Sequence, residues 1–110
     1  MKKIYIIYVG TELRSNKEDS IDRVWQYTND IRRALKILKE NITDIAESGF
    51  YKYAFLETVE LNNFDVNGNT MKTHVYRFEK ESNRYVRIGY FNNYLSFTDQ
   101  EGFQKIKKEA

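Results

Sequence analysis

The chain lacks several residue types on which common protein chemistry depends. Its 110 residues include no cysteine, no proline and a single histidine, His74. Without cysteine there is no disulfide, no thiolate nucleophile and no cysteine ligand for zinc or an iron–sulfur cluster. One histidine also excludes His-rich metal sites and a Cys/His dyad. We therefore expect neither a bound metal nor a cofactor.

Long apolar runs and a strong charge of one sign are also missing. No run approaches the roughly 18–20 residues of a membrane span, and the opening MKKIYIIYVG lacks the cleavage site of a signal peptide. Lys and Arg number 18 against 16 Asp and Glu, a net charge of +2, which argues against a histone-like polycation and against an acidic DNA mimic. The sequence predicts a cytoplasmic protein with no membrane partner.

The composition favours one folded domain over residues 1–110. Hydrophobic residues make up 41% of the chain and charged residues 31%, which is enough for a real core. No proline-rich or Gly/Ser-rich linker divides the sequence. Because the net charge is only +2, any binding driven by charge must come from a local patch.

Motifs of common enzymes are absent from the sequence. There is no Gly-x-Ser-x-Gly elbow to place a nucleophile near His74, no phosphate-binding loop, no Gly-x-Gly-x-x-Gly and no EF-hand spacing. Among possible acid pairs, Glu57 and Glu60 point to opposite faces of a strand, while Asp19 and Asp22 suit helix capping. Glu57 interrupts an apolar strand face, which we interpret as the point where that strand leaves the core. The chain is predicted not to be an enzyme.

The first half of the chain predicts a strand followed by a long helix. Residues Lys3–Val9 are apolar on both alternating faces, which is typical of a central strand. From Ile21 to Ile45 apolar residues recur every three or four positions, which predicts one amphipathic helix from about Ser20 to Gly49, where glycine takes the left-handed conformation. In an alternative interpretation Ile21–Tyr27 forms a strand and the helix begins at Thr28 or Asn29.

The second half predicts an antiparallel meander. Period-two patterning indicates a strand from Phe50 to about Asp65, and Asn67-Gly68 is typical of a type I′ hairpin turn, which would pair Val59 with Tyr76. After a turn at residues 81–83, further elements are expected at Arg84–Tyr90 (strand), Tyr94–Phe97 (short strand) and beyond Thr98 (short helix). The predicted fold is α+β, in the order β-α-β-β-β-β-α. A long amphipathic helix packs on a mixed, mainly antiparallel sheet of four to five strands, and the helix crossover makes the first two strands parallel.

Arginine and aromatic residues are interleaved in and around the predicted strand Arg84–Tyr90. Guanidinium groups bind phosphate in a bidentate manner, and aromatic rings stack on bases. Arg84 and Arg87 are therefore expected to contact phosphate, Tyr85 or Tyr90 to stack on a base, and Asn92 to read a base edge. The candidate ligand-binding residues are Arg77, Arg84, Tyr85, Arg87, Tyr90 and Asn92. The alternative is a solvated sheet face, because simple alternation puts Arg87 on one face and Tyr90 on the other.

Aromatic residues make up 15% of the chain, so many rings are expected near the surface, where they favour protein interfaces. Together with the apolar stripe of the long helix, this predicts a homo-oligomer.

The stretches KIYIIYVG, RRALKILKEN and GFYKYAFLETVELN resemble the small accessory proteins that bacteriophages of AT-rich bacteria encode. The resemblance covers most of the chain and lies in its size, composition and β-α-β opening. It implies an anti-defence protein that binds a host immune effector or sequesters a nucleotide signal. Two other classes stay open: a nucleic-acid-binding module that adds Lys105, Lys107 and Lys108 to the same patch, and a structural or assembly subunit.

Overall fold

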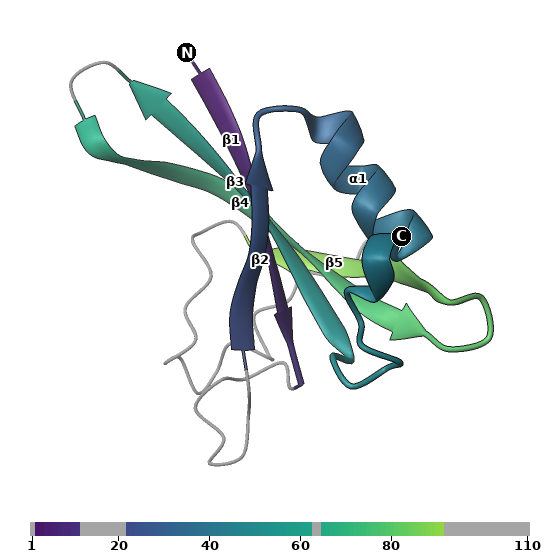
Figure 1. The fold of residues 1–110 in the computed structure, drawn as a ribbon. Helices are drawn as coiled ribbons and strands as arrows, with labels where there is room; N and C mark the ends of the chain where they lie inside the picture. Colours follow the sequence, from purple (N-terminus) through teal and green to yellow (C-terminus); the bar gives the residue numbers. More distant parts are fainter. Residues whose placement is uncertain (1, 12–21, 63–64, 92–110) are drawn as a thin grey trace.

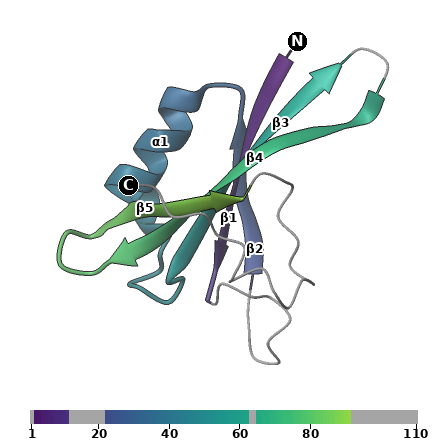
Figure 2. The same ribbon diagram turned by 180° about the vertical axis from the view of Figure 1, so that it is seen from behind.

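The computed structural model describes residues 2–11, 22–62 and 65–91 (Figure 1). Five strands form one sheet in the order β2-β1-β3-β4-β5, and every neighbouring pair is antiparallel. In the described part of the chain, one α-helix lies across a face of this sheet that is here called the helix side (Figures 1 and 2). The elements are β1 (Lys2–Gly10), β2 (Asp22–Thr28), α1 (Ile31–Glu40), a 3-10 turn (Ile42–Asp44), β3 (Tyr53–Asn62), β4 (Asp65–Glu79) and β5 (Arg84–Phe91). The chain is thus an α+β protein, and within the described residues no helix is long and apolar enough to cross a membrane.

The long predicted helix is wrong, because its first third is strand β2. The segment DRVWQYT is rich in β-branched and aromatic residues, which favour a strand, and it pairs with β1 from Tyr5↔Thr28 to Gly10↔Asp22. Helix α1 begins only after Asp30, whose side chain accepts a hydrogen bond from the Arg32 backbone N–H at 3.0 Å. The structure thus follows the alternative interpretation. The predicted parallel pair, Lys3–Val9 with the strand from Phe50, is also wrong, because β1 pairs with β3 in the antiparallel direction from Lys2↔Leu61 to Gly10↔Tyr53.

Helix α1 ends at Asn41 and not at Gly49. Asn41 adopts the left-handed conformation (φ 46°, ψ 49°), and its backbone N–H donates to the Ile37 carbonyl. Its buried side chain also ties together the segment that follows, because its Oδ1 accepts from the Ala46 N–H at 3.0 Å and its Nδ2 donates to Asn83 Oδ1 at 3.2 Å. Gly49 does take a positive φ of 93°, but in the later turn.

The β3–β4 hairpin turns earlier than predicted. Asn62 pairs with Asp65, so Asn67-Gly68 lies inside β4. Ala54 pairs with Tyr76, whereas the predicted register paired Tyr76 with Val59. The offset is an odd number of residues and therefore exchanges the two faces of the strand. The observed register places Ala54 and Tyr76 in the core beneath the helix.

Each side of the sheet carries buried residues. The helix-side core consists of residues from β1, α1, β3, β4, β5 and the segment after the helix: Ile7, Val9, Ala34, Ile37, Leu38, Ile45, Ala46, Tyr51, Ala54, Leu56, Tyr76 and Tyr85. On the opposite side, Phe55 and Val75 are fully buried. Glu57 is also buried on that side, between Ile6 and Thr73 in the middle of β3, so the interpretation that the strand leaves the core there is wrong. Burial, with the nearby Glu57 charge, raises the pKa of Tyr8.

Candidate ligand-binding surface

A β-bulge in β5 brings two of the predicted site residues, Arg87 and Tyr90, onto one face of the sheet. The β4–β5 ladder pairs Phe78 with Tyr85, Tyr76 with Arg87 and His74 with Tyr90, and its register shifts between Val75 and Tyr76. The extra residue on β5 reverses the alternation beyond it. Tyr90 therefore lies on the helix side together with Arg87, although simple alternation predicted opposite faces.

Two cations on this face each lie over a tyrosine ring. The Arg87 Cζ atom is 5.8 Å from the centroid of the Tyr76 ring, and Arg87 Nη2 donates to the Tyr76 hydroxyl at 3.4 Å. The Lys72 Nζ atom is 4.3 Å from the centroid of the Tyr90 ring, which also lies 6.3 Å from the ring of His74. A cation–π contact of this kind contributes an interaction free energy of about 0.5–1 kcal/mol at an exposed position. We call Lys72, His74, Tyr76, Arg87 and Tyr90 the β4–β5 surface.

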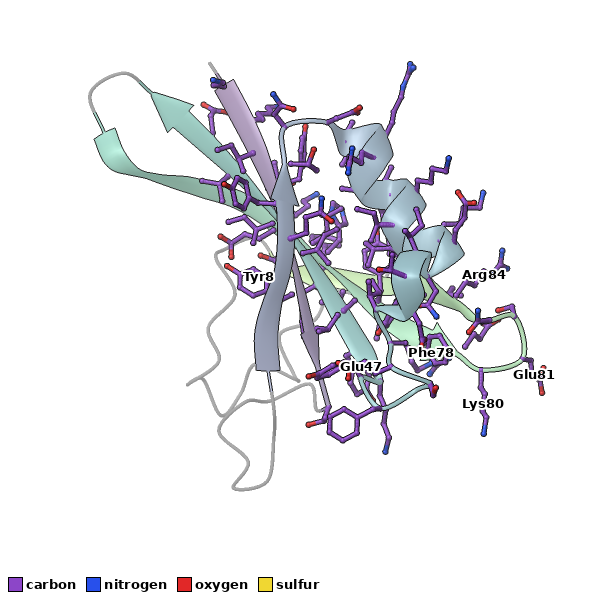
Figure 3. The ribbon with its side chains drawn as sticks, viewed as in Figure 1. Tyr8, Glu47, Phe78, Lys80, Glu81 and Arg84 are labelled. Carbon is purple, nitrogen blue, oxygen red and sulfur yellow. The ribbon has the colours of Figure 1, made fainter. Side chains whose placement is uncertain are left out.

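A groove of about 320 Å³ between α1 and β5 adjoins the β4–β5 surface and shares Tyr76 with it. Its other lining residues are Leu35 and Lys39 of α1 and Arg84, Tyr85 and Val86 of β5. Arg84 lies beside α1 (Figure 3), and Leu35 is 37% exposed. The groove therefore combines an apolar wall with two cations, Lys39 and Arg84.

The structure places Tyr85 in the protein core. Its side chain is 3% exposed, and its hydroxyl donates to the Tyr51 carbonyl at 2.7 Å. The ring packs edge-on against Phe78, with centroids 5.4 Å apart. Burial raises the pKa of the Tyr85 hydroxyl well above its usual range, and the charges of Asp44 and Glu47 add to the shift. Tyr85 supports the groove, but its faces are covered by protein.

The other predicted site residues separate into three groups. Arg87 and Tyr90 belong to the β4–β5 surface, and Arg84 reaches the adjoining groove. Arg77 is exposed and pairs with Val86, which puts it on the side of the sheet opposite the helix. Asn92 lies outside the described residues, as do the predicted Tyr94–Phe97 strand, the C-terminal helix and its lysines.

Three residues of the β4–β5 surface, Lys72, His74 and Tyr76, were not among the predicted site residues. Lys72 and His74 join it because β4 pairs with β5 as far as Thr73↔Phe91. The period-two spacing of Lys72, His74 and Tyr76 was the signal that could have found them. This signal was overlooked because the turn predicted at Asn67-Gly68 put these residues close to the end of the hairpin.

No protein-family model, curated protein or solved structure matches the chain. Within the residues that the structure describes, no three acidic or histidine side chains gather into a metal site. The side chains of the β4–β5 surface offer electrostatic and aromatic contacts. Its cations can bind an anion, and its half-buried rings, His74 and Tyr90, can contact a planar group.

Proposed function

We propose that the chain is a non-enzymatic binding protein that holds a nucleotide on the β4–β5 surface. Arg87 and Lys72 contact phosphate in this proposal, and the base packs against Tyr90. The observation that supports it is the pair of cations over tyrosine rings on neighbouring strands of one sheet face. A nucleotide joins a polyanion to a planar ring, which matches that combination of groups.

In this proposal, nucleotide binding displaces Lys72 from the ring of Tyr90. A phosphate draws the Lys72 ammonium away from the ring that it covers at 4.3 Å, and the uncovered ring can then stack on the base. The exchange is favourable because base–aromatic stacking contributes about 1–3 kcal/mol, more than the roughly 0.5–1 kcal/mol of an exposed cation–π contact. Lys39 and Arg84 in the adjoining groove are placed to bind a further phosphate.

The resemblance to phage accessory proteins extends this proposal to a biological role. Under it, the nucleotide is a signal of a host defence system, and sequestering the signal antagonises that system. Binding a host effector protein through the same surface is the other form of this role. We also propose that the chain forms a homo-oligomer, since ligand sites often lie at subunit interfaces.

Native mass spectrometry identifies the ligand class most directly. The protein is purified from its bacterial host, and its mass is recorded before and after denaturation. A multimer that releases a nucleotide mass supports the proposal. An empty multimer that also binds none of a panel of nucleoside diphosphates and cyclic dinucleotides contradicts it and favours an assembly subunit.

Substitutions on the two sides of the sheet then locate the site. Arg87→Ala and Tyr90→Ala are each expected to weaken nucleotide binding by about tenfold or more, equivalent to about 1.4 kcal/mol, in isothermal titration calorimetry. Arg77→Ala removes an arginine from the opposite side of the sheet and is expected to bind normally. Equal affinity in all three variants contradicts the proposed site. Affinity for oligonucleotides alone, falling steeply with salt, indicates a nucleic-acid-binding module instead.

A further inference from the structure

A second cleft, of about 580 Å³, lies on the other flank of α1, between the helix and edge strand β2. Its volume falls within the roughly 300–1,000 Å³ of small-molecule sites. The lining comes from one residue of β2, the α1 N-cap, α1 itself and the turn after it: Gln26, Asp30, Arg32, Arg33, Lys36, Ile37, Ile42 and Thr43. We call it the β2–α1 cleft.

Three of the lining side chains are cationic and one is acidic. The acid, Asp30, already accepts the Arg32 backbone N–H at 3.0 Å as the helix cap. Within the described part of the chain, neither Arg32 nor Arg33 forms an ion pair. Lys36 lies 4.0 Å from Glu40, but both side chains are more than half exposed, so this contact is screened by solvent.

The spacing of these cations concentrates positive charge at the cleft. Lys36 lies four residues after Arg32 and three after Arg33, and side chains at these spacings are neighbours on a helix surface. Like charges at such spacings repel and destabilise a helix. An anion held between them turns this repulsion into attraction.

The remaining lining residues indicate the rest of the ligand. Ile37, which is 4% exposed, and Ile42 provide an apolar wall. The Gln26 amide can donate to an oxygen atom, whereas the Thr43 hydroxyl already donates to the Ile42 carbonyl at 2.6 Å. Among the described residues no aromatic ring lines the β2–α1 cleft, so these residues offer no stacking partner for a base.

We propose that the β2–α1 cleft binds the phosphate group of a small phosphorylated molecule whose non-aromatic part lies on Ile37 and Ile42. Arg32, Arg33 and Lys36 surround the phosphate. This site does not depend on the proposed nucleotide site, because the two lie on opposite flanks of α1 and have no lining residue in common.

The arginine Nε–Hε signals in ¹H–¹⁵N NMR spectra report directly on this cleft. Titration with pyrophosphate, and separately with glycerol 3-phosphate, is expected to shift the signals of Arg32 and Arg33 to saturation, while glycerol leaves them in place. Tighter binding of glycerol 3-phosphate than of inorganic phosphate is expected, because its carbon chain can contact Ile37 and Ile42 and the Gln26 amide can donate to one of its hydroxyl oxygens. Absence of a saturable shift at millimolar pyrophosphate and low salt overturns the proposal.

Matched variants separate the cleft from general positive charge. Arg33→Ala is expected to weaken pyrophosphate binding by about tenfold, measured on the Arg32 signal. Lys80→Ala removes an exposed cation from the turn between β4 and β5, outside both proposed sites, and is expected to leave pyrophosphate binding at Arg32 unchanged. Dispersed backbone spectra check that each variant is folded, and Arg33→Lys should retain part of the affinity if charge is what matters. Equal losses of affinity in Arg33→Ala and Lys80→Ala overturn the proposed cleft site.

Two further outcomes keep this proposal separate from the proposed function. If Arg87→Ala abolishes the pyrophosphate effect on Arg32 and Arg33, the cleft is not the binding site, although the β4–β5 surface remains one. If duplex DNA shifts the NMR signals of all the α1 cations equally and pyrophosphate shifts none of them, these cations bind a nucleic acid and the small-molecule proposal is wrong.

Discussion

Replacing Tyr85 with phenylalanine separates a structural role for this ring from a ligand-binding one. The Tyr85 side chain is 3% exposed, and its hydroxyl donates to the Tyr51 carbonyl at 2.7 Å. The substitution keeps the ring and removes only the donor. Because the variant cannot form this buried hydrogen bond, we expect the free energy of unfolding to fall by about 1–3 kcal/mol.

This loss is large enough to measure in several ways. For a domain near 100 residues, 1 kcal/mol corresponds to a shift in melting temperature of about 4–8 °C. Urea unfolding followed by circular dichroism gives the free energy, and calorimetry gives the melting temperature. The control is Tyr90→Phe, because the half-buried Tyr90 hydroxyl forms no hydrogen bond among the described residues. Its stability is expected to change by less than about 0.5 kcal/mol.

Nucleotide affinity provides the second readout of Tyr85→Phe. We expect the folded variant to bind as tightly as the wild type, since the Tyr85 ring is covered on its faces. Unchanged stability would show that the hydroxyl makes no net contribution. Weakened binding at unchanged stability would refute the assignment of Tyr85 to the core and restore it as a ligand contact.

Three more predictions concern pH and the ends of α1. The raised pKa of Tyr85 means that the folded state keeps its proton when the unfolded chain loses it, so stability should fall above about pH 10, by up to about 1.4 kcal/mol per pH unit. Urea unfolding at increasing alkaline pH measures this, and Tyr85→Phe should have a shallower slope. Asn41→Ala loses side-chain hydrogen bonds to Asp44, Ala46 and Asn83 at a left-handed position, so chemical denaturation should show a loss above about 2 kcal/mol, with Asn41→Gly less affected. Asp30→Ala removes the helix cap and should cost about 1 kcal/mol in thermal unfolding, with equal stability refuting the cap.

Local sequence patterns predicted the elements whose signals do not compete. Strand β1 lies inside the sheet, because it pairs with β2 on one side and with β3 on the other. The apolar residues on its two faces predicted this position. The turn before Arg84 and strand β5 also lie where they were predicted. In these segments hydrophobic period and turn residues favour the same structure.

Strand β2 and the β3–β4 turn could not be read locally. Residues 22–28 fit a helical stripe, and only their pairing with β1 makes them a strand. Asn67-Gly68 is a strong turn signal, but the register that buries Ala54 and Tyr76 under α1 places the turn between Asn62 and Asp65 instead. Tertiary packing decided both cases, and single-sequence patterns do not contain it.

The candidate site depended on the same non-local information. Arg87 and Tyr90 were named from composition, but they share a face only because of the bulge in β5. The burial of Tyr85 follows from where α1 packs. The cations of the β2–α1 cleft could be recognised only once the helix was known to begin after Asp30.

Chemical-shift mapping of the backbone amides tests the proposed nucleotide site most directly. A nucleoside diphosphate and a cyclic dinucleotide are titrated separately into ¹⁵N-labelled protein. Saturable shifts are expected at Lys72, His74, Tyr76, Arg87 and Tyr90, with little change at Arg77 on the opposite side of the sheet. Saturable shifts confined to Arg77 and its neighbours, or no shift with either nucleotide, would contradict the proposed site.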